Sequence, residues 1–229
     1  GAAIHDYYHT GKAEVLRVFS SEFEEDEIPV EDLFREYDDM PLLEQVALDL
    51  AEGSVLDVGA GSGCHSIALK QMGKDAVAID ISALSVNVMK ERGVNARLVN
   101  LYDDSFNDKF DTILMLMNGT GIIGRLENMP LFFERMKQLL APGGHVILDS
   151  SDLRYLYEDE DGSIMIDLAD EYYGLVDYQM VYKNVAGEPF DWLYIDFDTL
   201  SMYAEEHGFI CEKCIDGKHY DYLARLTIK

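Results

Sequence analysis

A short apolar run that ends in three closely spaced glycines is the part of this sequence best suited to chemistry. Residues 55–58 predict a buried strand, and Gly59, Gly61 and Gly63 follow it at every second position. Glycine has no Cβ, so a ligand can approach the backbone closely there. A helix predicted from Cys64 would point its first N–H groups at a carboxylate or a phosphate. The loop alone fits NAD, FAD or S-adenosylmethionine, or a glycine turn without a ligand.

Two acidic residues narrow this choice. Asp57 stands inside the strand, two residues before Gly59, where its carboxylate would face the pocket and hold a cationic amino group directly or through water. Asp80 ends the next predicted strand, where a carboxylate can accept both hydroxyls of a ribose. NAD enzymes share an acid like Asp80, but not its pairing with Asp57. Cys64 also stands where a dinucleotide motif usually has Gly or Ala.

Strands that alternate with helices must position these residues. The apolar runs predict strands at 54–58, 76–79, 96–99, 110–117 and 145–148. The helical spacings predict helices at 64–72, 83–92 and 131–140. This alternation favours a parallel sheet with right-handed crossovers. A helix over 197–207 and two strands, 209–215 and 220–228, joined by a turn at Asp216-Gly217, complete the chain.

Two segments fall outside this alternation. Residues 12–50 are predicted to be helical, with one helix over 12–25 and a second that begins after Pro41. The acidic run 158–161 predicts an exposed loop, and residues 164–192 predict an antiparallel excursion with a turn at 186–188. Aromatic residues are frequent here, and they suit a flat or cationic acceptor, although they could equally pack the excursion onto the sheet or form a dimer surface. They are Tyr155, Tyr157, Tyr172, Tyr173, Tyr178, Tyr182, Phe190, Trp192 and Tyr194.

Several motifs in order resemble class I S-adenosylmethionine-dependent methyltransferases, from about residue 53 to 150 and again in the last helix and strand pair. Residues 110–113 are similar to the start of that family's fourth strand, and residues 139–144 to its L-x-P-G-G turn. The resemblance implies an α/β fold with a doubly wound, mostly parallel seven-stranded sheet and a C-terminal antiparallel hairpin. N-terminal helices and an antiparallel β insertion after the fifth strand are added to it. The expected segments are 1–52, an S-adenosylmethionine-binding core at 53–150, an insertion and substrate cover at 151–196, and the final helix and hairpin at 197–229.

The resemblance also implies which residues hold the cofactor. They are Asp57, Gly59, Ala60, Gly61, Gly63, Asp80, Ile81, Asn100, Leu101 and Met117. The glycines would lie against the methionine moiety with Asp57 near its ammonium, Asp80 would hold the ribose, and Ile81 would pack on the adenine. The family often has an acid where Asn100 stands, so Asp103 competes with Asn100 for the adenine contact.

On the substrate side, the resemblance places Asn118 and Gly119 beside the transferred methyl group. Asn118 could orient an acceptor by hydrogen bonding, or it could cap the following helix. Asp152 and the histidines of residues 5–9 are candidate bases, with surface or structural roles as the alternative, so the catalytic residue is left unassigned.

The net charge of −26 restricts the acceptor. Such a surface repels phosphate backbones and anionic membranes, so nucleic acid is disfavoured, whereas a small neutral or cationic molecule or a basic protein is compatible. Cys64, Cys211 and Cys214 are too few for a disulfide framework, and no metal site is expected. No apolar run approaches the length of a membrane span, so a cytoplasmic location is expected by default, and homo-oligomers stay open.

The sequence therefore predicts an S-adenosylmethionine-dependent methyltransferase with a small-molecule acceptor. A nicotinamide oxidoreductase conflicts with Asp57 and with the final hairpin. A non-catalytic S-adenosylmethionine-binding partner or regulatory subunit is the alternative, because a fold does not establish a function.

Overall fold

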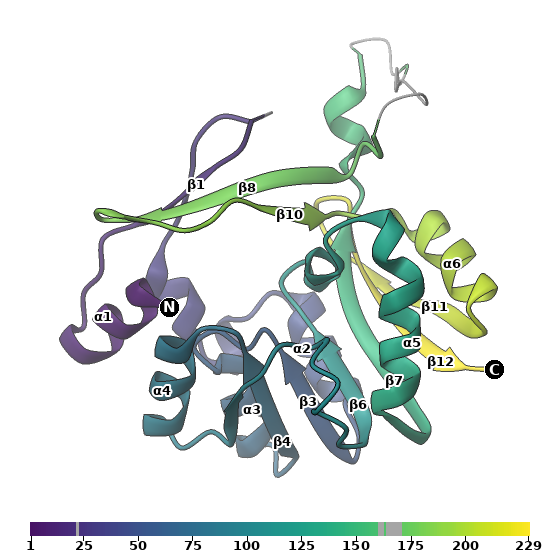
Figure 1. The fold of residues 1–229 in the computed structure, drawn as a ribbon, viewed down its shortest axis with the longest axis horizontal. Coiled ribbons are helices and arrows are strands. Elements are labelled where there is room, and N and C mark those ends of the chain that lie inside the picture. The colour runs from purple at the N-terminus through teal and green to yellow at the C-terminus, as the bar shows by residue number, and fades with distance from the viewer. Residues whose placement is uncertain (22, 160–162, 164–170) are drawn as a thin grey trace.

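A seven-stranded sheet forms the centre of the computed structural model, which describes residues 1–21, 23–159, 163 and 171–229 (Figure 1). Its order is β11-β12-β7-β6-β3-β4-β5. Its strands are β3 (Ser54–Val58), β4 (Asp75–Asp80), β5 (Ala96–Leu98), β6 (Phe110–Met115), β7 (Leu140–Ser151), β11 (Phe209–Asp216) and β12 (Asp221–Ile228). The five strands from β5 to β7 are parallel, and β12 is antiparallel to both neighbours. The predicted fold class is confirmed.

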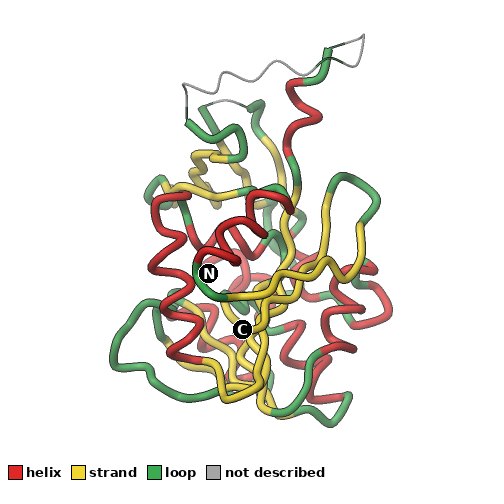
Figure 2. The backbone as a smooth tube through the Cα atoms, turned by 90° about the vertical axis from the view of Figure 1, so that its right-hand side faces the viewer, coloured by secondary structure: helices red, strands yellow, loops and turns green. Residues whose placement is uncertain are grey.

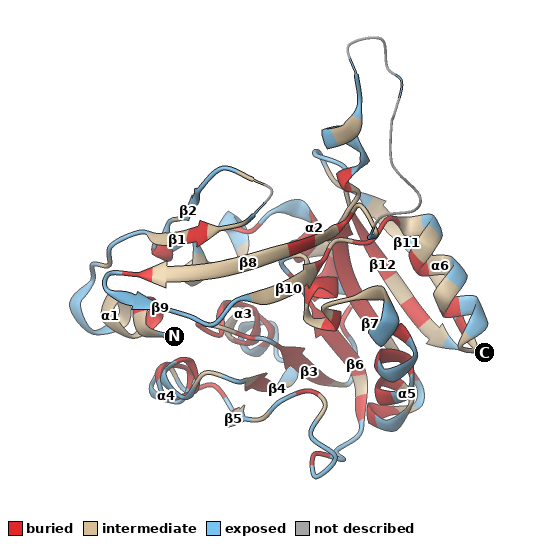
Figure 3. Ribbon diagram, turned by 45° about the horizontal axis from the view of Figure 1, so that its top comes forward, coloured by how far each residue is buried: buried red, intermediate tan, exposed pale blue. Residues whose placement is uncertain are grey.

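Helices cover both faces of this sheet (Figure 2). Apolar side chains of α2 (Leu42–Leu50) and α3 (Cys64–Gln71) pack on one face, and α4 (Ala83–Glu91) packs there on β4 and β5. The other face is covered by α5 (Met129–Leu139) and α6 (Phe197–Glu206). Buried residues are therefore concentrated on β3, β6 and β7 in the middle of the molecule (Figure 3).

A second sheet, here called the covering sheet, lies across the carboxyl ends of the central strands (Figure 1). It contains β1 (Leu16–Phe19), β2 (Asp26–Ile28), β8 (Leu175–Tyr182), β9 (Val185–Ala186) and β10 (Phe190–Leu193). β8 pairs with β10 on one side and with β1 on the other, where Arg17 lies opposite Val181. The covering sheet is thus built from two segments that are more than a hundred residues apart in the chain.

This arrangement corrects the prediction for the N-terminal segment. The helix predicted over residues 12–25 is wrong, because Leu16–Phe19 is β1 and Asp26–Ile28 is β2. The apolar residues there also suit a strand, and pairing with β8 decides between the two readings. The helix after Pro41 is confirmed as α2. α1 (Ala2–Thr10) lies in the N-terminal segment that was expected to be helical, although no bounds were predicted for it, and the 3-10 helices η1 (Val30–Phe34) and η2 (Tyr37–Asp39) fill the stretch before α2.

The antiparallel insertion after the fifth strand is confirmed, but its turn was misplaced. β8 and β9 pair Tyr182 with Val185, so the chain reverses at Lys183 and Asn184 rather than at 186–188. Lys183 adopts a left-handed φ of 54°, as such two-residue turns require. Residues 160–162 and 164–170, which include part of the acidic run and the start of the predicted excursion, lie outside the described residues. The division at residues 52, 150 and 196 stays a prediction.

Candidate functional site

The glycine loop lies between the end of β3 and the start of α3. Gly59, Gly61 and Gly63 have φ values of 70°, 56° and 83°, which favour glycine over residues with a Cβ. The Gly59 and Ala60 N–H groups both donate to the Ile79 carbonyl, at 2.9 and 3.1 Å, which ties the loop to β4. A Cβ on Gly61 would come no closer than 3.8 Å to Ile4 Cδ1, so there is room for a ligand to approach this backbone.

Asp80 stands at the end of β4, beside that loop. Its Oδ2 accepts the Gly61 N–H at 2.9 Å, and its Oδ1 accepts the Ser82 N–H at 2.7 Å. A carboxylate oxygen has two acceptor sites, so each oxygen keeps one for a ligand hydroxyl. Open space over Gly61 and an oriented carboxylate beside it fit the amino acid and ribose parts of the expected S-adenosylmethionine.

Asp57 is almost completely buried next to the glycine loop. It is 2% exposed, and its Oδ2 accepts the Ser66 hydroxyl at 2.6 Å. Burial raises the pKa of Asp57. Its expected contact with a ligand ammonium stays a prediction, and the structure gives it a structural partner on α3 instead.

A buried ionic cluster that sequence reasoning missed lies next to Asp57. His65 Nε2 lies 2.7 Å from Glu44 Oε2, which also accepts Arg35 Nε at 3.2 Å. Burial opposes the charge of His65, but its hydrogen bond with Glu44 and the charge of Asp57 raise its pKa. The cluster joins η1, α2 and α3 under the loop. A histidine and an acid 21 residues apart on separate helices give no local pattern that would reveal it.

A cavity of about 420 Å³ opens at the carboxyl ends of β5 and β6. Asn100 and Asp103 both line it, together with Ile122. The competition between Asn100 and Asp103 for an adenine contact is therefore open, and Asn100 Oδ1 already accepts the Tyr102 N–H at 2.9 Å. Leu101 is buried, which suits a structural role as well as a ligand contact.

Ile81 and Met117, the other two apolar candidates, are exposed. Ile81 directly follows Asp80 and is 74% exposed, so the described residues leave its predicted adenine-facing surface uncovered. Met117 is 39% exposed at the end of β6. Each is free to pack on a ligand, and both assignments stay predictions.

The chain turns sharply after β6, at residues 117–120. Met117 and Asn118 both adopt left-handed backbone, with φ of 66° and 56°, which is costly for residues other than glycine. Asp149, on the neighbouring strand β7, accepts the Asn118 N–H with Oδ2 and the Gly119 N–H with Oδ1, both at 3.0 Å. Burial raises the pKa of Asp149 to about 6. Sequence reasoning missed Asp149, although an acid inside an apolar strand is a feature that could have revealed it.

Asp152 follows the end of β7, but its carboxylate is already engaged. It accepts Arg154 Nε at 2.8 Å and caps η5 (Leu153–Tyr157). The Tyr173 hydroxyl lies 3.0 Å from Asp152 and also 3.0 Å from Asp196. The role of Asp152 as a base therefore stays a prediction. The candidate histidines, His5 and His9, pack edge to face in α1 with 4.4 Å between ring centroids.

One face of the covering sheet points at the 117–120 turn. Paired residues of antiparallel strands share a face, so Val176, Tyr178 and Met180 of β8 face the same way as their partners Trp192, Phe190 and Val18. Trp192 lies so close to the backbone after the turn that a Cβ on Gly121 would be 1.8 Å from its Cε2. We call these six side chains the inner face, and of their aromatic rings Trp192 lies against the Gly121 backbone.

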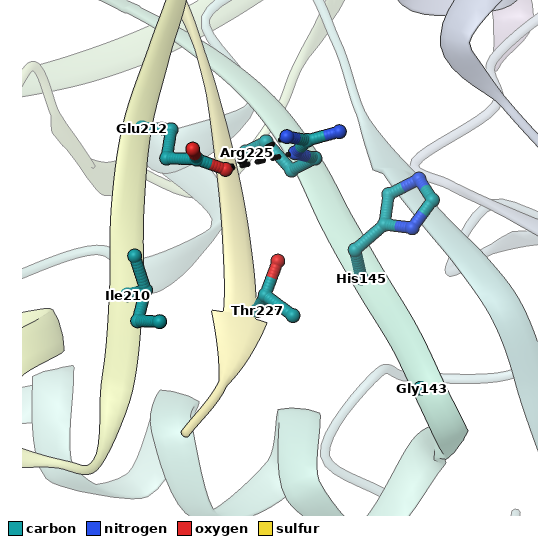
Figure 4. Close-up of a pocket in the computed structure, with 6 residues that line it drawn as sticks. All are labelled: Gly143, His145, Ile210, Glu212, Arg225 and Thr227. Atoms are coloured by element: carbon teal, nitrogen blue, oxygen red, sulfur yellow. Dashed lines mark hydrogen bonds and ion pairs between the residues drawn. The ribbon is translucent and has the colours of Figure 1, made fainter.

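A second cavity, of about 350 Å³, lies elsewhere on the central sheet (Figure 4). It is lined by Gly143, His145, Ile210, Glu212, Arg225 and Thr227. Arg225 Nη2 and Glu212 Oε2 are paired at 2.7 Å, and burial lowers the pKa of His145. None of the predicted site residues borders this cavity, so we do not assign it to the functional site.

Cys211 and Cys214 do not form a common site. Cys211 packs against the core on the α5 and α6 side of the sheet, whereas Cys214 packs against the core on the α2 and α3 side.

In the described ranges, no helix combines the length and apolarity needed to cross a membrane.

Comparisons with known proteins agree with this geometry. Residues 30–209 match a family described as a methyltransferase domain. A SAM-dependent methyltransferase from Bacteroides fragilis, crystallised with S-adenosyl-L-homocysteine, is 65% identical with a TM-score of 0.94, over 99% of this chain and 93% of that one. The cypemycin N-terminal methyltransferase of a Streptomyces species is 31% identical over 103 residues, which span 43% of this chain and 42% of that enzyme. The CcbJ methyltransferase from Streptomyces caelestis shares the fold at 16% identity and a TM-score of 0.62, over 84% of this chain and 94% of that one.

Proposed function

This chain belongs to the S-adenosylmethionine-dependent methyltransferases, and from that premise we propose that it methylates an amine nitrogen of a small molecule. S-adenosylmethionine is its cofactor, and when bound it supplies the methyl group on a sulfonium. We assign the glycine loop and Asp80 to cofactor binding, because the loop leaves its backbone open and the carboxylate keeps free acceptor sites. The roles expected for Asp57, Ala60, Ile81, Asn100 and Leu101 stay part of this proposal.

The acceptor is proposed to lie between the 117–120 turn and the inner face of the covering sheet. The observation that carries this placement is the position of Trp192 against the Gly121 backbone. Tyr178 and Met180 continue the inner face beyond Trp192, and both are only partly buried, which leaves surface for a ligand. Ligands of open α/β sheets bind at the carboxyl ends of the strands, and the covering sheet crosses that edge.

Three features favour an amine. Aromatic rings attract cations through their π faces, and Tyr178, Phe190 and Trp192 stand on the inner face. The net charge of −26 attracts a cationic acceptor and repels an anionic one. The cypemycin enzyme, which shares part of its length with this chain, is named for methylation of an N-terminus.

Methyl transfer asks the protein mainly for alignment. The acceptor nitrogen must be neutral, approach the methyl carbon in line with the bond to sulfur, and be shielded from water. Transfer would form a new N–C bond as the S–C bond breaks, S-adenosylhomocysteine would be the leaving group, and the methylated nitrogen would release its proton to water. Asn118 Oδ1, held by the Ser151 hydroxyl at 2.7 Å, is placed to accept a hydrogen bond from the nitrogen. A cytoplasmic location is proposed with this function.

A turnover screen tests the proposal. The protein is incubated with S-adenosylmethionine and a panel of primary and secondary amines, each matched with the alcohol and the carboxylic acid of the same carbon skeleton, and S-adenosylhomocysteine is measured. We expect product from amines and none from the acids. Turnover of alcohols in preference to amines would refute the assignment. Tight S-adenosylhomocysteine binding without turnover of any acceptor would favour the non-catalytic partner.

A further inference from the structure

Three consecutive residues at the end of β7 bind the residues that follow β6. Asp149 accepts the N–H groups of Asn118 and Gly119, and the Ser151 hydroxyl donates to Asn118 Oδ1 at 2.7 Å. Between them, the hydroxyls of Ser150 and Thr120 lie 2.7 Å apart. The 117–120 turn is therefore held by side chains of the neighbouring strand at each position from 118 to 120.

The same contacts reach the covering sheet. The Thr120 hydroxyl lies 2.9 Å from the carbonyl of Leu193, the last residue of β10. The Ile195 N–H donates to Ser150 Oγ at 2.9 Å. The Thr120 hydroxyl therefore lies within donating distance of both the Ser150 hydroxyl and the Leu193 carbonyl. The turn is thus fixed to β7 beneath it and to the covering sheet beside it.

The turn needs such support because its backbone is strained. Left-handed φ at both Met117 and Asn118 persists only where the surroundings hold it. Gly119 is required for a different reason, since a Cβ there would lie 2.7 Å from Met115 Cβ. Asn tolerates left-handed backbone better than most residues other than glycine, so the strain falls mainly on Met117, and Asn118 can display its amide side chain from this turn.

The residue that supports the turn, Asp149, is an unusual one because it is a buried carboxylate. It is 7% exposed and pairs with Leu223 of β12, and the charged groups that act on its pKa are Glu44 of α2, which raises it, and His65 of α3, which lowers it. In the described part of the chain, it forms no salt bridge. A buried carboxylate is costly, and here it is balanced by two backbone N–H groups. Only an acceptor with two oxygens satisfies both donors.

We propose that Asp149, Ser150 and Ser151 are positioning residues that lock the 117–120 turn, so that Asn118 Oδ1 is presented to the acceptor nitrogen. This rests on the proposed function in placing the acceptor at Asn118. The three side chains act through the turn and need not touch the acceptor. Asp149 fixes the backbone, Ser151 fixes the amide of Asn118, and Ser150 links the turn to the covering sheet.

The backbone part is tested without any acceptor. In Asp149→Asn, one of the two N–H groups loses its acceptor, so deuterium exchange in a peptide spanning 116–121 should accelerate about tenfold, as for one lost hydrogen bond. The affinity for S-adenosylhomocysteine, measured by calorimetry, should change less than the exchange rate does. Asp111→Asn is the matched control, because Asp111 also binds a backbone N–H, that of Ser54 at 2.8 Å, at the opposite end of the sheet. Unchanged exchange in Asp149→Asn would overturn the proposal.

The side-chain part is tested with Ser151→Ala, a small change that spares the backbone contacts. With an amine that the wild-type protein methylates, kcat should fall about tenfold with little change in KM. Ser151→Thr, which keeps the hydroxyl, should restore most of it. In an Asn118→Ala background, Ser151→Ala should cause no further loss, and additive losses would overturn the role through Asn118. If the wild-type protein methylates no amine, the proposed function fails, while the exchange experiment still decides whether Asp149 holds the turn.

Discussion

The contacts that position the ligand-facing residues span very different separations along the sequence on the cofactor side and on the acceptor side of this site. On the cofactor side, Asp80 binds the Gly61 N–H, 19 residues away, within one strand-helix-strand unit. On the acceptor side, β1 pairs with β8, and Asp177 of β8 accepts the Ser20 hydroxyl across 157 residues. A change on the cofactor side should therefore stay local, whereas a change in the covering sheet should reach the acceptor through a distant segment.

The largest effect is expected at Gly61. In Gly61→Val, a branched side chain would occupy the space that the loop leaves open, so S-adenosylhomocysteine binding should become unmeasurable by calorimetry. The left-handed φ of 56° adds a loss of about 1–2 kcal/mol in the free energy of unfolding. Gly73→Val is the control, since Gly73 has a φ of 77° and open space around it but lies at the far end of α3. Binding in folded Gly61→Val would refute the cofactor site.

A smaller effect on the same side is expected at Asp80. Asp80→Ala removes the acceptor proposed for two ribose hydroxyls, so binding of S-adenosylhomocysteine should weaken by about 2–4 kcal/mol. Asp75→Ala, at the exposed start of the same strand, should leave the affinity unchanged. A loss below about 0.5 kcal/mol in Asp80→Ala would be typical of a surface position and would move the ribose elsewhere.

The range of the contacts also explains what the sequence could predict. The glycine loop, Asp80 and the alternation of strands and helices are encoded in short stretches, and the central sheet was predicted correctly from them. β1 was mistaken for a helix because its identity depends on pairing with β8, which no local pattern contains. The Glu44–His65 pair was missed for the same reason, because its two residues lie on separate helices. Asp149 has a local signal, an acid in an apolar strand, but its partners at 118 and 119 lie on another element and only the fold shows them. Asp57 was identified, but its orientation toward Ser66 could be seen only in the fold.

On the acceptor side, Gly121→Ala should separate turnover from cofactor binding. The added Cβ would collide with the Trp192 ring, which must move out of the inner face. Such overpacking should lower the free energy of unfolding by about 1–3 kcal/mol. We expect turnover of the amine to fall while S-adenosylhomocysteine affinity stays within about 0.5 kcal/mol.

Gly187→Ala serves as the control for this variant. Gly187 lies just after β9, next to the same covering sheet, and is exposed; a Cβ added there would lie 3.3 Å from the Met180 carbonyl and away from Trp192. Excision of the insertion is a poorer test, because it would leave β1 without β8. Equal loss of turnover and cofactor binding in Gly121→Ala would show that the two sides are not separable.

The most gradual effect is a pH dependence that should act in opposite directions on stability and turnover. Burial raises the pKa of Asp149 to about 6, whereas an unfolded Asp titrates near 3.9. Between these pH values the folded state binds the proton more tightly than the unfolded state does. This group alone therefore raises the free energy of unfolding as the pH falls from about 6 to 4, by about 3 kcal/mol at most. Above about 6, that contribution is absent.

Turnover should move the other way. Protonation places a hydrogen on one Asp149 oxygen and weakens its hold on the Asn118 or Gly119 N–H, so turnover should decline as the pH falls through about 6. The ionisation of an amine acceptor and of His65 also changes turnover with pH, but both ionisations occur in the Asp149→Asn variant as well. The ratio of wild-type to Asp149→Asn turnover therefore isolates this group, and it should rise with a midpoint near 6. A ratio that stays constant from pH 5 to about 8 would show that the ionised carboxylate does not hold the turn. The contacts with the covering sheet would then be what holds the acceptor side in place.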